Sequence, residues 1–180
     1  MKQPKKIAGN TAIFTAFVFL VTACAMIPNG ISPVNGFDVN RYAGVWYEIA
    51  RLDHSFERGL TRIQTEYALR KDGGINVINS GFDPEKKVWK KATGKGYFVG
   101  SPDVGQLKVS FFGPFYGAYN VIDLDRNYTY AIVCGNTRNY LWILARTPNL
   151  EEPVRAALIE KAKSMGFETD KLIIVPHESP

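Results

Sequence analysis

The sequence has 180 residues, of which 46% are hydrophobic and 22% charged, and this balance suits one domain with a sizeable core. Its formal net charge is +5, and loss of the three lysines in residues 1–23 would lower that charge to +2. Because no basic run has helical or ribbon spacing, the composition argues against a nucleic-acid-binding protein.

The first 23 residues are typical of a secretion signal. Lys2, Lys5 and Lys6 precede a mostly apolar run over residues 7–21. That run is too short, and too interrupted at residues 9–11, to form a convincing membrane-spanning helix. We therefore predict that residues 1–23 are a signal peptide, absent from the mature chain.

The end of this segment, Val21-Thr22-Ala23-Cys24, resembles a bacterial lipobox. The motif predicts that Cys24 is lipidated on sulfur and becomes the new N-terminus, which would attach the protein to a membrane. Ala25 favours the outer membrane, with the domain on the periplasmic side. Residues 24–35 would then be the lipidated cysteine and a flexible tether. The alternative is an ordinary signal peptide with an incidental cysteine.

Short segments of alternating apolar and polar residues fill the chain from 44 to 146. Turn residues such as Asp72-Gly73 and Gly113-Pro114 separate them. The strands are expected at 44–53, 60–71, 74–82, 87–99, 105–112, 116–124, 128–134 and 139–146. Eight consecutive strands with short connections predict an all-β fold, an eight-stranded antiparallel up-and-down β-barrel with room for one small ligand.

One helix is expected after these strands. Pro153 and two preceding acidic residues are typical of its first turn, and Gly166 of its end. An apolar stripe should pack it against the outside of the barrel; its members are Val154, Ala157, Leu158, Ala162 and Met165. A short ninth strand is expected at 172–175.

Three segments resemble the signature motifs of the lipocalin family and occur in the family's order. They are Gly44-Val45-Trp46-Tyr47, residues 123–128, and Leu144-Ala145-Arg146. The middle segment has Leu124 where the family usually has threonine. The resemblance covers residues 36–176, leaving 177–180 as a tail, and it is closest to the lipoprotein lipocalins of bacterial outer membranes.

This resemblance implies a function as well as a fold. Trp46 would close the barrel floor and Arg146 would lay its guanidinium across the indole, a cation–π contact worth about 0.5–2 kcal/mol. Fatty acids or lysophospholipids are the implied ligands, for lipid storage, transport or membrane maintenance. A binding protein rather than an enzyme is expected.

Alternation along the strands predicts which side chains face the barrel interior. Tyr116 and Trp142 are the preferred ligand contacts, because both are wide aromatics with a polar atom beside small residues. Each predicted inward residue could instead fill the packed lower half of the barrel. The full set is Ile63, Tyr67, Val109, Phe111, Tyr116, Ala118, Trp142 and Leu144.

A polar loop over residues 53–60 contains His54 and Arg58. Its simplest interpretation is a hydrogen-bonded connection at the barrel mouth. Arg58 could alternatively hold the phosphate or carboxylate of a lipid headgroup. Hydrolysis through His54 is a weaker hypothesis, because no serine nucleophile motif accompanies it.

Cys134 lies in an apolar strand and is expected to be a buried structural thiol. A lipid-processing enzyme or redox scavenger acting through Cys134 or His54 is the alternative function. The sequence offers no clustered metal ligands and no histidine on an inward strand position for haem, so no cofactor is expected. An apolar run over residues 111–116 raises the hypothesis of a homodimer.

Overall fold

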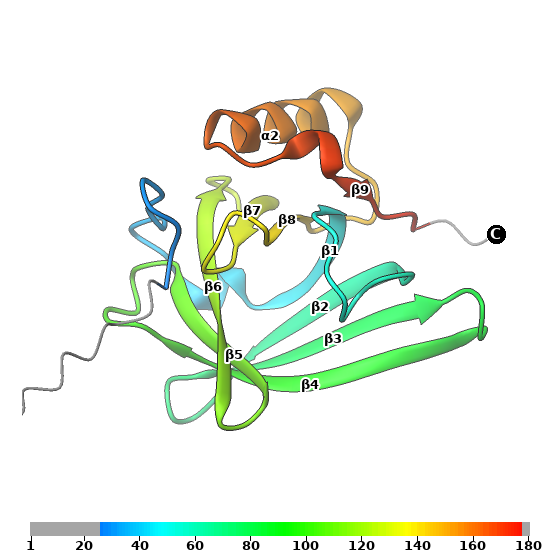
Figure 1. The fold of residues 1–180 in the computed structure, drawn as a ribbon. Coiled ribbons are helices and arrows are strands. Elements are labelled where there is room, and N and C mark those ends of the chain that lie inside the picture. The colour runs from blue at the N-terminus through cyan, green and yellow to red at the C-terminus, as the bar shows by residue number, and fades with distance from the viewer. Residues whose placement is uncertain (1–25, 178–180) are drawn as a thin grey trace, which may run out of the picture.

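The computed structural model describes residues 26–177, so the predicted signal peptide, Cys24 and residues 178–180 lie outside the described residues. Eight antiparallel strands form the body of the molecule (Figure 1). They are β1 (Gly44–Arg51), β2 (Thr61–Leu69), β3 (Ile75–Asp83), β4 (Val88–Phe98), β5 (Gln106–Phe112), β6 (Phe115–Leu124), β7 (Tyr130–Cys134) and β8 (Leu141–Ala145).

These strands pair in sequence order, and β1 pairs with both β2 and β8. The sheet therefore closes on itself, which leaves the eight strands without a free edge along most of their length. The predicted up-and-down barrel is confirmed. Strands β7 and β8 are shorter than expected.

The ninth strand, β9 (Ile173–Ile174), covers a short exposed part of β1. The first half of β1 pairs with β2 through Tyr47, and β9 then pairs with Ala50 and Arg51. His177, which the sequence assigned to a tail, continues this packing: its Nε2 lies 2.7 Å from the Glu48 carbonyl oxygen.

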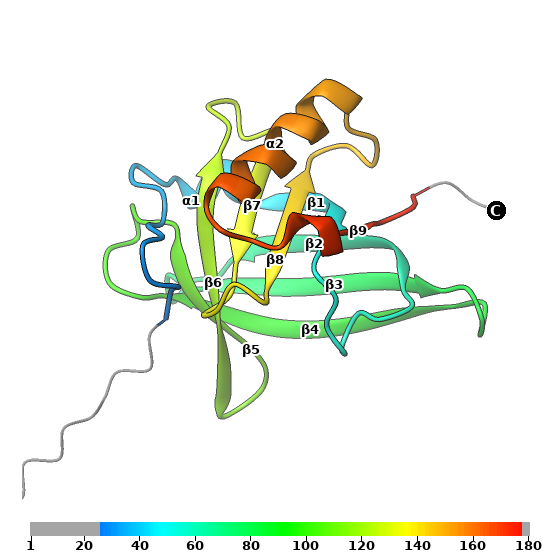
Figure 2. The same cartoon turned by 45° about the horizontal axis from the view of Figure 1, so that its top comes forward.

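Two apolar clusters lie on opposite faces of the barrel wall. One fills the lower interior, where Tyr42, Trp46, Leu107 and Val121 are buried. The other lies between the outer face of β7 and β8 and the helix α2 (Glu152–Ser164) (Figures 1 and 2).

Helix α2 packs on the outside of the barrel, as its apolar stripe predicted. Leu158 and Ala162 are buried against the outer cluster, with Val154 and Met165 half-buried beside them. Ala157 is exposed, and Ile159 packs against the barrel instead. Within residues 26–177, no helix is long and apolar enough to cross a membrane.

The segment before the barrel differs from the expected flexible tether. Its backbone is held along β6, since the Val34 amide donates to the Val121 carbonyl oxygen and Val34 accepts from Gly105. Arg138 donates to the carbonyl oxygen of Asn29, and Asn120 donates to that of Met26. Residues 26–35 are therefore part of the folded domain, because the barrel supplies donors and acceptors for their backbone.

A one-turn helix, α1 (Val39–Tyr42), precedes β1. The side chain of Asp38 caps it by accepting a hydrogen bond of 2.9 Å from the Asn40 amide. This turn of helix places Tyr42 under the barrel, against Trp46.

Candidate functional site

The closed end of the barrel is built around Trp46 and Arg146. The indole is fully buried and donates to the Tyr42 carbonyl oxygen over 2.8 Å. The guanidinium carbon of Arg146 lies 4.1 Å from the indole centroid, which is the stacked arrangement that the family resemblance implies.

Arg146 also donates hydrogen bonds to the carbonyl groups that surround the indole. Its guanidinium donates to the backbone oxygens of Val45, Tyr42 and Arg41 and, through Nε, to that of Tyr128. Gly44 makes room for it, because a Cβ atom there would lie 3.3 Å from Arg146 Nη1 at a φ of +96°. The floor is therefore sealed by one side chain that satisfies several carbonyls.

A layer of tyrosines separates this floor from the space above. The Tyr119 hydroxyl lies 2.6 Å from the hydroxyls of both Tyr42 and Tyr67. Burial raises the pKa of all three phenols, so they stay neutral and can act as both donors and acceptors. This chain of hydroxyls forms the lower end of the cavity.

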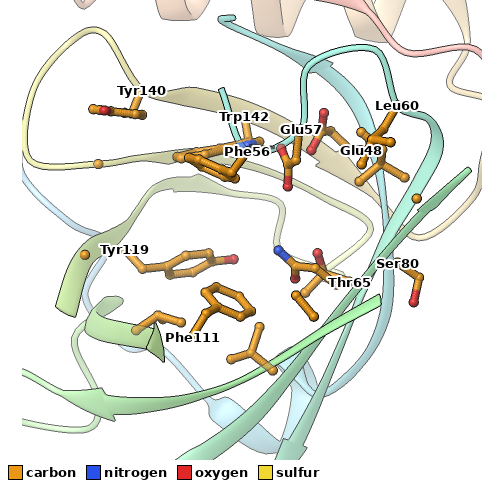
Figure 3. Close-up of a pocket in the computed structure, with 18 of the residues that line it drawn as sticks. Glu48, Phe56, Glu57, Leu60, Thr65, Ser80, Phe111, Tyr119, Tyr140 and Trp142 are labelled. Carbon is orange, nitrogen blue, oxygen red and sulfur yellow. Dashed lines mark hydrogen bonds between the residues drawn. The ribbon is translucent and has the colours of Figure 1, made fainter. Parts of the chain in front are cut away.

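Above the tyrosines lies a cavity of about 730 Å³, open at the opposite end of the barrel (Figure 3). This volume is in the range of small-molecule sites, and much of the lining is apolar. Phe111 and Tyr119 form one side in the close-up, and Phe56 and Trp142 face them. Of the predicted ligand contacts, Tyr67, Phe111, Trp142 and Leu144 line this cavity, as do Ile63 and Val109.

Two predicted residues point the other way. Tyr116 and Ala118 border the cavity, but the register of β6 assigns their side chains to the outer face. Lys108 pairs with Ala118 and places its Nζ 5.2 Å from the Tyr116 ring centroid, outside the barrel. The predicted inward orientation of these two side chains was therefore wrong.

A β-bulge explains the error. A regular two-residue hairpin through Phe112 and Phe115 would pair Val109 with Ala118, whereas Val109 pairs with Gly117. One extra residue on β5 therefore exchanges the two faces of β6. Tyr119 faces inward as a result, and the sequence prediction missed it because a bulge leaves no clear signal in the alternation.

Several polar side chains interrupt the apolar lining, and four of them are Thr65, Asn79, Glu48 and Glu57. Thr65 and Asn79 are cross-strand partners on β2 and β3, and both line the cavity. Buried Asn79 Oδ1 has no hydrogen-bond partner within the described residues, so it is available to a donor on a ligand. Glu48 and Glu57 complete the set near the mouth (Figure 3).

These two glutamates belong to a buried ionic network. Arg51 Nη1 donates to Glu48 Oε1 over 3.0 Å, and its Nη2 donates to the Glu57 carbonyl oxygen. His54 Nε2 lies 3.0 Å from Glu57 Oε2, and the Trp142 indole donates to the same oxygen over 3.3 Å. The polar loop thus folds inward and orients Trp142.

The pKa values of the two glutamates are shifted in opposite directions. Burial raises the pKa of Glu48 well above its ordinary value, and the negative charge of Glu57 adds to this effect. Burial opposes ionisation of Glu57 as well, but hydrogen bonds from His54 and Trp142 hold its pKa below the ordinary value. Of the two carboxyls, Glu48 is therefore the one that binds a proton more readily.

Arg58 does not reach the cavity. Its guanidinium is largely exposed and binds the Asp53 carboxylate, with Nη2 2.7 Å from Oδ2. The predicted headgroup contact is absent from this arrangement. No sequence signal distinguishes an inward Glu57 from an inward Arg58, because both residues lie in the same loop between β1 and β2.

Cys134 is fully buried at the end of β7. Burial raises the pKa of its thiol to about 12, which disfavours the thiolate that redox chemistry requires. Over the described range, no three His, Cys, Asp or Glu side chains are grouped as metal ligands would be.

The chain is similar to known proteins over most of its length. A family model described as "Lipocalin-like domain" matches residues 37–177. The outer membrane lipoprotein Blc of Citrobacter freundii is 55% identical over 159 residues, covering 87% of this chain and 90% of the relative. The Blc protein of Vibrio cholerae is 52% identical, covering 88% and 94%.

More distant proteins share the fold. Temperature-induced lipocalin-1 of Arabidopsis thaliana is 33% identical and covers 82% of this chain and 81% of the relative. The solved structure of insecticyanin from the tobacco hornworm Manduca sexta superposes with a TM-score of 0.69 at 23% identity. That superposition covers 86% of this chain and 88% of insecticyanin.

Proposed function

Since the chain belongs to the lipocalin family, whose model matches residues 37–177, we propose that it carries a fatty acid or lysophospholipid in its barrel cavity. The cavity of about 730 Å³, whose largely apolar lining is interrupted by a few polar side chains, is the observation that supports this proposal. An amphipath could lay its acyl chain along the apolar lining and keep its headgroup at the mouth.

The energetics favour such a ligand. Each methylene moved from water into an apolar cavity contributes about 0.8 kcal/mol, so a dozen methylenes contribute on the order of 10 kcal/mol. Association and ordering consume part of this free energy, and micromolar or tighter binding remains within reach. Within the cavity, Asn79 and Glu57 provide acceptors for hydrogen-bond donors on a ligand.

Fluorescence of Trp142 tests this proposal, because its indole lines the cavity. We expect the delipidated protein to show saturable quenching when titrated with a lysophospholipid or a fatty acid. The Trp142→Phe variant should lose the spectral change, since Trp46 lies in the floor and Trp89 outside the barrel. Absence of saturable binding of any such amphipath to the wild-type protein would overturn the proposal.

We further propose that Cys24 is lipidated and attaches the domain to the outer membrane. The lipobox-like run 21–24 and the naming of the Citrobacter and Vibrio relatives as outer membrane lipoproteins support this location. The mature protein should fractionate with outer membranes and carry acyl mass on its N-terminal residue. Cys24→Ser should move it to the soluble periplasmic fraction, and continued membrane retention of that variant would contradict the anchor.

A further inference from the structure

The folded chain begins beside the open end of the barrel. Asn120 Nδ2 donates to the carbonyl oxygens of Met26 and Gly135, over 2.8 Å and 3.1 Å, so Met26 is held at the start of the β7–β8 hairpin. That hairpin lines the cavity mouth through Asn136 and Tyr140. Figures 1 and 2 both show the start of the described chain next to it.

Very little chain separates this point from the lipidated residue. Cys24 precedes Met26 by two positions, and two residues span at most about 7 Å. The acyl chains on Cys24 would therefore enter the bilayer close to the barrel mouth. A long flexible tether would leave the orientation of the barrel free, but the backbone contacts of residues 26–35 remove that freedom.

The mouth itself carries exposed aromatic side chains. Phe112 and Phe115, at the tip of the β5–β6 hairpin, are 81% and 78% exposed, and Phe56 on the β1–β2 loop is 61% exposed. The tip lies five residues along β6 from Asn120, which is roughly 17 Å at the rise of a strand. The tip therefore projects beyond Met26 on the side of the mouth. A membrane surface that approaches from that side contacts the aromatic tip before it comes close to Met26.

Positive charge lies on one side of the same opening. The β3–β4 connection carries exposed Lys86 and Lys87, and the start of β4 carries exposed Lys90 and Lys91, against the two carboxylates of Asp83 and Glu85. Lys90 and Lys91 also line the cavity. Lysines next to exposed aromatics complement an anionic phospholipid surface, where the charge meets phosphate and the ring enters the headgroup layer.

We propose that the cavity mouth lies against the bilayer that holds the Cys24 acyl chains, with the Phe112–Phe115 tip in the headgroup layer. An amphipath would then pass between bilayer and cavity without crossing water. This inference rests on the proposed anchor at Cys24, and it adds an orientation that a membrane-tethered carrier need not have.

Spin labels at the two ends of the barrel can measure this orientation. The mature lipidated protein is reconstituted in vesicles of phosphatidylethanolamine and phosphatidylglycerol, with a label at Phe112→Cys or, as matched control, at Lys71→Cys. Lys71 is exposed in the β2–β3 turn at the floor end. Acylated Cys24 and buried Cys134 should both escape labelling.

We expect the Phe112 label to collide with lipid-soluble oxygen several-fold more often than the Lys71 label, and less often with a water-soluble nickel chelate. Equal, water-like accessibility of the two labels, or immersion of the Lys71 label, would overturn the proposal. So would spin–spin broadening at Phe112 with low accessibility to both reagents, since a second copy would then cover the mouth.

The same sample separates this inference from the function on which it rests. If the N-terminal residue carries no acyl mass, both the anchor and the orientation are wrong. If the protein is acylated and binds a lysophospholipid, but the Phe112 label behaves as in water, the carrier function stands and the orientation alone fails.

Discussion

Arg146 contacts segments that are far apart in the sequence and meet at the barrel floor. It stacks on Trp46 and donates to carbonyl oxygens of the α1 turn, of β1 and of the β6–β7 loop. Removing it would leave these partly buried acceptors without donors, and such losses cost about 1–3 kcal/mol each where water cannot replace the donor.

We therefore predict that Arg146→Ala lowers the free energy of unfolding by about 2–4 kcal/mol. Arg146→Lys should lie between this variant and the wild type, because an ammonium keeps the charge but loses the planar fork. Denaturant unfolding followed by tryptophan fluorescence measures both changes. A loss below about 0.5 kcal/mol in the alanine variant would show that the floor does not depend on the guanidinium.

Glu48 gives the stability of the fold a specific pH dependence. Its pKa is higher in the folded than in the unfolded chain, mainly because of burial. Its stabilising contribution is therefore complete below the unfolded pKa and is lost as the pH rises through the folded pKa. Glu57 has the opposite sign, because its pKa is lowered on folding and its contribution is lost as the pH falls.

Replacing Glu48 by glutamine, which resembles the protonated acid, should remove its share of this dependence. We expect the stability of Glu48→Gln relative to the wild type to increase as the pH rises above the ordinary value of 4.5. Unfolding curves at a series of pH values measure the difference. Glu66→Gln, at an exposed position of β2, is the control; a parallel trend in both variants would argue against the assignment.

Cys134 supplies a test of the redox alternative. Its buried thiol has a pKa of about 12, so little thiolate forms at neutral pH. We predict that the native protein does not react with a soluble thiol reagent at pH near 8, and that it reacts fully after unfolding. Rapid modification of the native protein, or peroxide turnover that Cys134→Ser abolishes, would revive the redox hypothesis.

At the scale of elements, the strands determine which side chains reach the cavity. Thr65 and Glu66 are neighbours on β2, yet Thr65 lines the cavity and Glu66 is exposed on the outer face. A phenylalanine at position 65 would therefore add a ring inside the barrel, and a phenylalanine at position 66 would add the same ring outside it.

We predict that Thr65→Phe weakens binding of an acyl ligand by about tenfold or more, whereas Glu66→Phe leaves it nearly unchanged. Displacing two methylenes from the cavity would cost about 1.6 kcal/mol, which exceeds a tenfold change in Kd. Titration calorimetry measures this, with circular dichroism to confirm that both variants fold. Equal affinities would place the ligand elsewhere.

The elements also show what the sequence could and could not predict. Alternation along the strands indicated that Ile63, Phe111 and Leu144 face the interior, and all three line the cavity. It failed on β6, because the bulge in β5 between Val109 and Phe112 reverses the faces of Tyr116 and Tyr119. Register depends on the partner strand, and single-strand periodicity carries no information about it.

Loops were harder to predict for a different reason. The inward turn of Glu57, the exposure of Arg58 and the packing of residues 26–35 all depend on partners far away in sequence, such as Trp142 and Asn120. Such contacts exist only once the barrel has formed. The floor contact between Trp46 and Arg146 is equally distant in sequence, and it was predicted only because the resemblance to the lipocalin motifs implied it.

At the scale of the whole molecule, the barrel is packed outside β7 and β8 and in its lower interior, and its upper interior is hollow. The outer cluster and α2 brace β7 and β8, and the tyrosine layer with the floor below it fills the lower interior. Packing concentrated in these two places leaves the upper interior open without leaving the sheet unsupported. The cavity is thus a property of the whole fold rather than of one loop.

Native mass spectrometry of the protein released gently from its own membranes would show whether the cavity holds a lipid. We expect the folded chain to carry one fatty acid or lysophospholipid in addition to the acyl groups on Cys24, and we expect Thr65→Phe to carry markedly less. A wild-type protein that retains no such lipid, and takes none up when it is offered, would contradict a ligand-carrying cavity.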